Sequence, residues 1–207
     1  MIIAQITDTH LSDVNAADPK FGVRAENLRA CIADINDLDP LPDAVIHTGD
    51  ITQHGRAAEF AHARALLQTL EAPLYVTPGN RDGRDGVVGA FAVDGYIMPD
   101  YAFVHYAIDK HPVRLVAVDS LGDGIGPKGD FCHDRLAALD ATLAEAPARP
   151  TALFMHHPPF DVPAAPDPFA YQRRRAVVDL ATVVSRHKQV IHIFAGHMHR
   201  PWTAMLG

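Results

Sequence analysis

Short apolar segments alternate with longer amphipathic stretches along this chain, and this alternation is the feature that most constrains its fold. In the stretches between the segments, apolar residues such as Leu28, Ile32 and Ile35 recur at helical spacing. Strands that alternate with helices predict an α/β protein built in layers. The segments that we expect to form these strands are residues 2–6, 44–47, 74–77, 151–155 and 190–194.

The middle of the chain is less regular. Residues 103–108 and 113–118 flank a turn-like segment and are expected to form a pair of antiparallel strands. Residues 83–95 are rich in glycine and charge, which predicts a loop with one helical turn. The proline-rich segment 158–168 directly follows an expected strand, so we interpret it as an active-site loop.

The chain has 207 residues, a length that suits a single domain spanning residues 1–207. Its formal net charge of −7 argues against a nucleic-acid polymer as partner. Its first apolar segment is too short for a signal peptide, and no segment predicts a membrane span, so we expect a cytoplasmic protein. The two cysteines, Cys31 and Cys132, are too few for a disulfide framework, and we expect them to be unpaired.

Polar side chains follow each of the five expected strands at the point where the strand ends. In open α/β sheets, ligands bind outside the carboxyl ends of the strands, so these side chains are expected to converge at one edge. They lack thiolates and combine carboxylate, amide and imidazole donors, which suits first-row divalent metal ions. Two such ions would share the set, since it is too large for one tetrahedral centre. The candidate metal ligands are Asp8, His10, Asp50, Asn80, His156, His197 and His199.

Two local patterns support this site. Asp8 and His10 are two residues apart, as are His197 and His199, so an extended backbone would direct the members of each pair to one side. Glycines precede several candidates and allow backbone conformations that other residues resist. These glycines are Gly49, Gly79 and Gly196.

The remaining histidines have simpler explanations. His47 and His192 lie inside expected strands and should be packed or hydrogen-bonded, whereas His62 and His187 lie in helical stretches and should be solvated. His157 is expected to support the site or face the substrate. The basic residues 173–175 are expected to begin a helix in solvent.

These motifs resemble those of the calcineurin-like metallophosphoesterases, and most closely the bacterial cyclic-nucleotide and glycerophosphodiester phosphodiesterases. The resemblance rests on Asp8-x-His10, Gly49-Asp50, Gly79-Asn80, Val118-Asp119-Ser120, His156-His157-Pro158-Pro159 and Gly196-His197-x-His199. It implies a four-layer α-β-β-α sandwich with mixed sheets, and hydrolysis of small phosphodiesters by a metal-bridging hydroxide.

The resemblance also implies two divalent ions (iron, manganese or zinc) bridged by Asp50. Asp8, His10 and His199 would complete one ion site; Asn80, His156 and His197 would complete the other. Asn80 and the neighbouring Arg81 are the expected catalytic residues. Related phosphodiesterases often form homodimers, and a homodimer is therefore allowed for this chain.

The sequence departs from the family pattern in two places. Arg81 occupies the usual position of a histidine, and arginine cannot donate a proton near neutral pH. The sequence also ends soon after His199, where similar proteins continue with further strands, so we expect a C-terminus that is short or truncated. These departures leave open a catalytically weak metal-binding or regulatory homologue. Within the enzyme class, a phosphomonoesterase or a nuclease is the nearest alternative.

Overall fold

A computed structural model describes residues 1–14, 19–99, 101–123, 126–163 and 169–205 of the chain. The first half forms a parallel three-stranded sheet in the order β1-β2-β3, with β1 at Ile3–Ile6, β2 at Ala44–His47 and β3 at Leu74–Val76. Two helices connect these strands, α1 at Pro19–Asn36 and α2 at Ala57–Leu67.

The second half forms a four-stranded sheet in the order β4-β5-β6-β7. Strand β4 is antiparallel to β5, and the other pairs are parallel, so the expected antiparallel pair in the middle of the chain is confirmed. The strands are β4 (Tyr106–Ile108), β5 (Arg114–Ala117), β6 (Thr151–Phe154) and β7 (Val190–Phe194); the connecting helices are α4 (His133–Ala144) and α5 (Arg174–Arg186).

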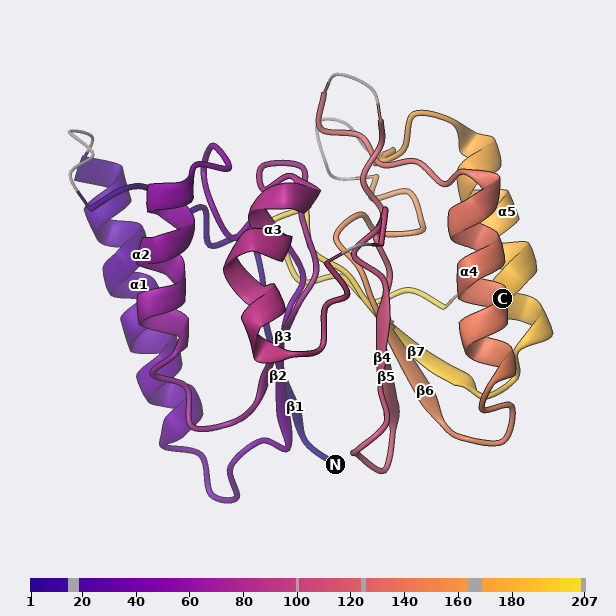
Figure 1. Cartoon of the computed structure of the whole chain (residues 1–207), viewed down its shortest axis with the longest axis horizontal. Helices are drawn as coiled ribbons and strands as arrows, with labels where there is room; N and C mark the ends of the chain where they lie inside the picture. Colours follow the sequence, from indigo (N-terminus) through magenta and orange to yellow (C-terminus); the bar gives the residue numbers. More distant parts are fainter. Residues whose placement is uncertain (15–18, 100, 124–125, 164–168, 206–207) are drawn as a thin grey trace.

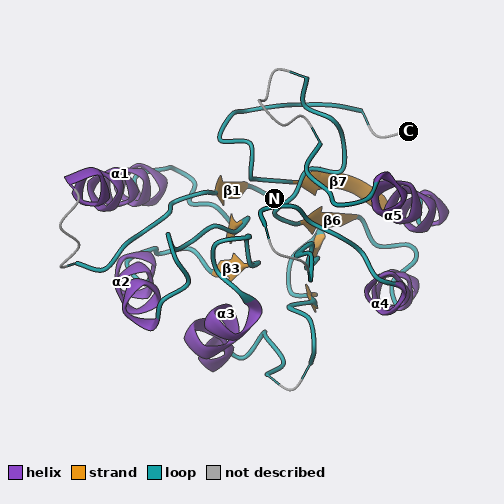
Figure 2. Cartoon of the chain, turned by 90° about the horizontal axis from the view of Figure 1, so that it is seen from above, coloured by secondary structure: helices purple, strands orange, loops and turns teal. Residues whose placement is uncertain are grey.

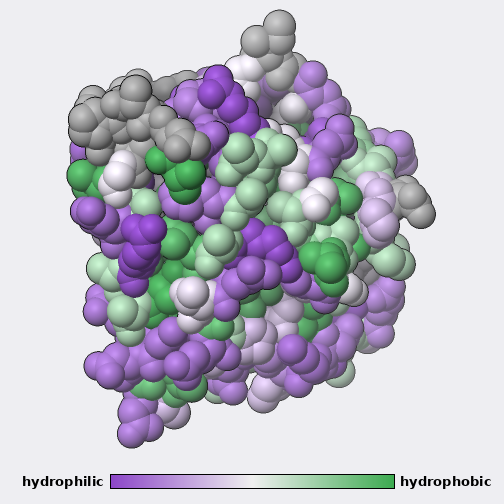
Figure 3. Space-filling view, turned by 60° about the vertical axis from the view of Figure 1, so that its left-hand side comes forward, coloured by the Kyte–Doolittle hydropathy of each residue, from purple (hydrophilic) through white to green (hydrophobic). Residues whose placement is uncertain are grey.

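The two sheets lie face to face between two layers of helices, which confirms the expected α-β-β-α arrangement (Figures 1 and 2). Helices α1 and α2 cover the outside of the first sheet together with α3 (Arg84–Phe91), and α4 and α5 cover the outside of the second sheet. On the face seen in Figure 3, hydrophilic residues predominate and hydrophobic residues are interspersed among them.

The alternation of side chains along β5 shows how the layers are held together. Leu115 and Ala117 belong to the hydrophobic cluster that also contains the residues of the first sheet. Val116 lies between them in sequence and belongs to the cluster formed with α4 and α5. Because successive side chains of a strand point to opposite faces, one buried strand contributes to both cores.

Residues 83–95 differ from the sequence-based prediction of a loop with a single turn. They form the helix α3 and the short 3-10 helix η1 (Ala92–Asp94). The helix is stabilised by two fully buried side chains one turn apart, Val87 and Phe91. A Cβ at Gly86 would lie 2.3 Å from the ring of Phe60, so the glycine that weakened the helical signal is what allows α3 to pack on α2. Among the described residues, no helix is long and apolar enough to cross a membrane.

Candidate metal centre

The loops that follow β1, β2 and β7 carry an unusual backbone conformation. Among the described residues, the only non-glycine residues with positive φ are five of the candidate ligands: Asp8 (53°), His10 (47°), Asp50 (51°), His197 (73°) and His199 (50°). The extended backbone expected for both ligand pairs was therefore wrong. A left-handed residue other than glycine costs about 1 kcal/mol or more, and such strain persists only where the surroundings enforce it.

Hydrogen bonds between the loops provide that enforcement. The backbone N–H of Asp8 donates to the carbonyl of Gly49 (3.0 Å), and that of His10 donates to the carbonyl of Asp50 (2.9 Å). The loop after β1 thus continues to pair with the loop after β2 beyond the end of the sheet, although its residues have left the extended conformation.

One group of donor atoms consists of Asp8, His10 and His199. The two imidazole Nε2 atoms lie 2.9 Å apart, and Asp8 Oδ1 is 3.3 Å from that of His199 and 3.9 Å from that of His10. The other carboxylate oxygen, Asp8 Oδ2, accepts hydrogen bonds from the Thr7 hydroxyl (2.7 Å) and the backbone N–H of His197 (2.9 Å). These bonds fix the carboxylate so that Oδ1 faces the two imidazoles.

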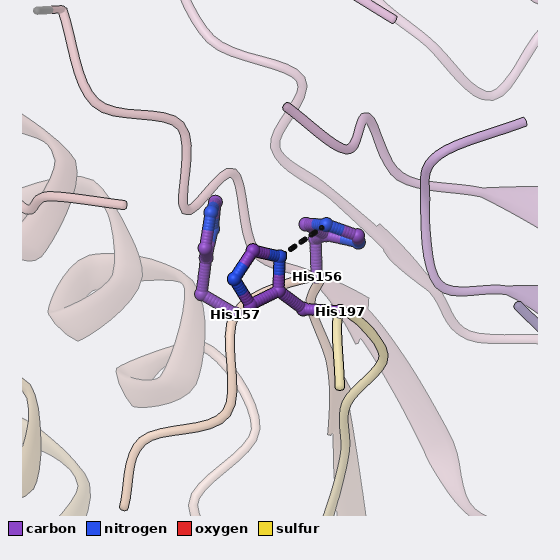
Figure 4. A group of neighbouring side chains, drawn as sticks. All are labelled: His156, His157 and His197. Carbon is purple, nitrogen blue, oxygen red and sulfur yellow. Dashed lines mark hydrogen bonds between the residues drawn. The ribbon is translucent and has the colours of Figure 1, made fainter. Parts of the chain in front are cut away.

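A second group consists of Asn80, His156 and His197. The Asn80 amide oxygen lies 3.0 Å from both His156 Nε2 and His197 Nδ1, and the two nitrogens are 3.1 Å apart. The dashed line in Figure 4 marks the contact between the two imidazoles. The His156 Nδ1–H donates to the carbonyl of Thr48 (2.9 Å), which leaves Nε2 with its lone pair. Lone pairs therefore converge on one point.

Asp50 lies between the two groups. Its Oδ2 is 3.6 Å from His10 Nε2, and its Oδ1 is 3.6 Å from His156 Nε2. The backbone N–H of Arg81 donates to Oδ1 at 2.7 Å and orients the carboxylate. Each oxygen of Asp50 thus faces a different group of donors.

These distances fit metal coordination. Two donors at about 2.1 Å from one ion are separated by about 3.0 to 3.4 Å, depending on the coordination geometry. The contacts of 2.9 to 3.1 Å within the two groups are close to this range. In addition, Asp8 Oδ1 is buried without a properly oriented hydrogen-bond donor among the described residues. A buried carboxylate oxygen requires a partner, and a divalent cation would supply it.

Burial and neighbouring charges set the protonation states. Burial lowers the pKa of His10 to about 4, so its ring is neutral near pH 7 and can act as a ligand. For Asp8, burial raises the pKa. The contact with His199 and the charge of His156 lower it by more than burial raises it, so the net shift of the pKa is downward. Burial raises the pKa of Asp50, against the opposing effect of His156. The contact with Asp8 raises the pKa of His199.

Glycines allow the loops to approach one another closely. A Cβ at Gly79 would lie 2.1 Å from the backbone nitrogen of Asp50, and one at Gly196 would lie 2.1 Å from the Thr7 hydroxyl. Gly49 has a positive φ of 93°, as the sequence-based reasoning expected. At Gly79 and Gly196, by contrast, no left-handed conformation is found, and the requirement is space.

Asp82 is a structural residue of the site to which the sequence analysis gave no role. It is buried and accepts four hydrogen bonds: from the backbone N–H groups of Ile51, Thr52 and Gly79, and from the Thr52 hydroxyl. Burial raises its pKa to about 6 against the effect of these donors. Asp82 thereby joins the loop after β3 to the loop that carries Asp50. Its position two residues after Asn80 was the available signal.

The other histidines divide into confirmed and wrong predictions. His47 is fully buried, receives a hydrogen bond from the Gly49 N–H (3.2 Å) and contacts the Thr9 hydroxyl (3.1 Å), as expected for a packed residue. His192 was expected to be packed or hydrogen-bonded; its ring packs against that of Phe194, with centroids 4.3 Å apart, but the residue is exposed.

His62 and His187 were expected to be solvated, but both are hydrogen-bonded. The His62 ring donates to the carbonyl of Ser12 (2.7 Å), and the His187 ring donates to Asp140 (2.7 Å). His62 lies on α2 and His187 directly follows α5, but helical periodicity does not show which loop or helix lies opposite such residues.

Other predictions concern residues outside the two donor groups. Cys31 and Cys132 are unpaired, as expected. The arginines at 173–175 lie at the exposed beginning of α5 and form ion pairs with Asp130, Asp161 and Asp179. The active-site loop predicted for residues 158–168 lies partly outside the described residues.

Arg81 is exposed beside the two donor groups. Its side chain forms no hydrogen bond or ion pair with any described residue, although its charge is close enough to lower the pKa of both His10 and Asp50. A cation at the entrance to the site is therefore available for an anionic ligand.

Comparison with known proteins agrees with this geometry. Residues 1–201 match the family model described as calcineurin-like phosphoesterase. The chain is 35% identical to glycerophosphodiester phosphodiesterase GpdQ of Enterobacter lignolyticus, over 96% of this chain and 71% of that protein. It is 28% identical to 3',5'-cyclic adenosine monophosphate phosphodiesterase CpdA of Escherichia coli, over 96% of this chain and 69% of that protein.

Solved structures show the same fold. A dimetal phosphatase from Danio rerio superposes with a TM-score of 0.72 at 18% identity, covering 95% of this chain and 81% of that one. The purple acid phosphatase PPD1 of yellow lupin superposes with a TM-score of 0.63 at 15% identity, covering 95% of this chain and 37% of that one. With the family model matching nearly the whole sequence, the chain belongs to the calcineurin-like phosphoesterase family.

Proposed function

We propose that this chain hydrolyses small phosphodiesters at a centre that holds two divalent metal ions. The observation that carries the proposal is the position of Asp50, whose two carboxylate oxygens each face a different group of donors at 3.6 Å. A carboxylate in that position can bridge two ions. When bound, two divalent ions activate water for attack and neutralise the charge on the phosphoryl oxygens.

The proposed ligand sets follow the two groups of donors. Asp50 belongs to both, and the metals that suit these donors are iron, manganese or zinc. Asp8, His10 and His199 complete one set, and Asn80, His156 and His197 complete the other. Two carboxylates balance only part of the charge of two divalent ions, so the site stays positive and suits the single negative charge of a phosphodiester.

Asn80 and Arg81 are the proposed catalytic residues. The Asn80 amide oxygen faces the two imidazoles of its group, which leaves the amide N–H₂ free to donate to a phosphoryl oxygen. The Arg81 guanidinium would bind a second phosphoryl oxygen and stabilise the charge that develops during the reaction. It cannot protonate the leaving group, so that proton has to come from water or from another group.

The relatives support the substrate class. Their names specify glycerophosphodiesters and cyclic nucleotides, which are both small phosphodiesters. We propose the same class for this chain, acting as a single domain of residues 1–207, because both halves of the fold supply ligands to one centre. A homodimer, which the family resemblance allows, would be detected by analytical ultracentrifugation.

Two measurements test the proposal: the metal content of the purified protein, and its rates on bis(p-nitrophenyl) phosphate and p-nitrophenyl phosphate. We expect two ions per chain and a faster rate on the diester. The Asp50→Asn variant should lose both ions and the activity, whereas Asp37→Asn, at an exposed position, should retain them. A faster rate on the monoester would favour a phosphomonoesterase. A protein with neither bound metal nor metal-restored activity would refute the proposal.

A further inference from the structure

His157 lies fully buried beside the metal centre but outside both proposed ligand sets. The centroid of its ring is 4.7 Å from that of His197 and 4.9 Å from that of His156. The centroids of His156 and His197 are 5.0 Å apart, so each of the three rings labelled in Figure 4 packs against the other two. His157 therefore packs against both imidazoles of the proposed ion site formed by Asn80, His156 and His197.

Both ring nitrogens of His157 already have partners. Its Nε2 is 2.8 Å from the carbonyl of Pro127, which can only accept, so Nε2 carries the proton. Its Nδ1 is 2.9 Å from the Ser120 hydroxyl and accepts a hydrogen bond from it. Although His156, His157 and His197 lie close enough together to form a possible metal site, these bonds leave His157 without a free lone pair.

Other segments of the chain hold His157 in place. The Tyr171 hydroxyl donates to its carbonyl (2.8 Å), and its own backbone N–H donates to the Ser120 hydroxyl oxygen (3.1 Å). The backbone of Gly129 packs directly on the ring: a Cβ there would be 2.8 Å from His157 Cγ. Three segments distant in sequence thus fix one imidazole.

His197 needs an external support of this kind. Its φ of 73° is unfavourable for a residue with a side chain, so its position depends on its surroundings. A rotation of its ring would move Nδ1 away from the Asn80 oxygen and from His156. The packed ring of His157 opposes such a rotation.

We infer that His157 is a positioning residue, held by Ser120 and Pro127, that orients the His197 imidazole for the ion site formed with Asn80 and His156. The inference rests on the proposed function. Residues that orient metal ligands typically contribute about 10- to 100-fold to metal affinity. The loss of His157 should therefore weaken one ion site and spare the other.

The test compares wild type with His157→Phe, which keeps a ring but loses both hydrogen bonds, and with Ser120→Ala, which loses the bond to Nδ1. Metal-free protein is titrated with Mn²⁺ by calorimetry. We expect His157→Phe to bind one ion as wild type does and the second about 10- to 100-fold more weakly. Ser120→Ala should show a smaller effect in the same direction.

His105→Phe is the matched control, because His105 is a partly buried histidine whose ring contacts the Thr142 hydroxyl of α4 (3.0 Å), away from the centre. This variant should lose stability without losing Mn²⁺ affinity. If His157→Phe behaves like the control and binds both ions as wild type does, the inference is overturned.

A second readout separates the inference from the proposed function. In metal-free protein, the ring nitrogen NMR signals of His197 should shift in His157→Phe and Ser120→Ala but not in His105→Phe. Unchanged His197 signals would overturn the inference. Failure of wild type to bind two ions would instead overturn the proposed function, and the signals of His197 would still decide the role of His157.

Discussion

Replacement of Gly79 by alanine tests the close approach on which the proposed metal centre depends. The added Cβ would lie 2.1 Å from the backbone nitrogen of Asp50, 2.3 Å from its Oδ1 and 2.8 Å from its Cα. The first two contacts are more than about 1 Å shorter than van der Waals contact, and the third is shorter by about 0.7 Å or more. Two of the three atoms belong to the backbone, so no side-chain rotation can relieve the overlap.

The loss in the free energy of unfolding of Gly79→Ala has two causes, which are overpacking and a lost hydrogen bond. Overpacking in a well-packed region costs about 1–3 kcal/mol. Displacement of the Gly79 N–H from Asp82, now 2.9 Å away, would cost about 1 kcal/mol more. We expect Gly79→Ala to lower the free energy of unfolding by about 3 kcal/mol. Because the displaced residue is Asp50, the affinity for both ions should fall together.

Gly89 provides the matched control. It lies within α3, and a Cβ there would meet no atom within 4 Å. Alanine is favoured over glycine in a helix, so Gly89→Ala should raise the free energy of unfolding by about 0.5–1 kcal/mol.

The assay is urea unfolding in the presence of EDTA, which removes any contribution from bound metal, followed by Mn²⁺ titration of the folded proteins. The reasoning would be refuted by a Gly79→Ala protein as stable as wild type that binds both ions normally. Equal destabilisation by both alanine variants would also contradict it.

Three further predictions concern single side chains. Arg81→Ala should lower kcat/KM for bis(p-nitrophenyl) phosphate about 100-fold, because one group that stabilises the transition state is lost. The exposed Arg175→Ala is the control. A large gain of activity in Arg81→His would instead identify the native protein as an impaired form. Asp82→Asn should lower the free energy of unfolding by about 2–3 kcal/mol, because an amide N–H₂ would face groups that are themselves donors; an unchanged urea midpoint would contradict this. Burial lowers the pKa of His105 to about 4, whereas its pKa in the unfolded state is about 6.5. Below pH 6.5 the unfolded state therefore binds a proton that the folded state does not, and the folded state loses stability as the pH falls toward 4. Between pH 7 and pH 5, wild type should lose about 2 kcal/mol relative to His105→Gln, and parallel stability curves for the two proteins would show that His105 does not titrate in this way.

The sequence predicted the elements whose signals are local. The strands β1, β2 and β6 are short and largely apolar, and a polar residue follows each within two positions, so their locations and the edge at which they end could be inferred. The sequence-based prediction failed at α3, where glycines masked the helical pattern. Whether Val87 and Phe91 find a surface to cover depends on α2, and no pattern within residues 83–95 contains that information.

The candidate ligands illustrate the same limit. The donor types after each strand were visible in the sequence, but the backbone that presents them was not. The extended conformation expected for Asp8 and His10 was wrong, because hydrogen bonds to the loop after β2 hold both residues at positive φ. The exposure of His192 was not predicted either, because it depends on which elements cover that part of β7.

The sequence by itself determined the α/β alternation, the kinds of donor atoms and their places at the ends of strands, because these properties depend on residues that are neighbours in the chain. The division of the donors into two groups, with Asp50 facing both, was implied by the family resemblance and not by the residue pattern itself; the tertiary structure supplies its geometry and the supporting positions of Asp82 and His157. Those relations join residues up to 189 positions apart, as between Asp8 and His197, and they depend on how the two sheets pack. Local sequence preference opposes the left-handed backbone at the ligands, so the packing of the whole fold has to impose it.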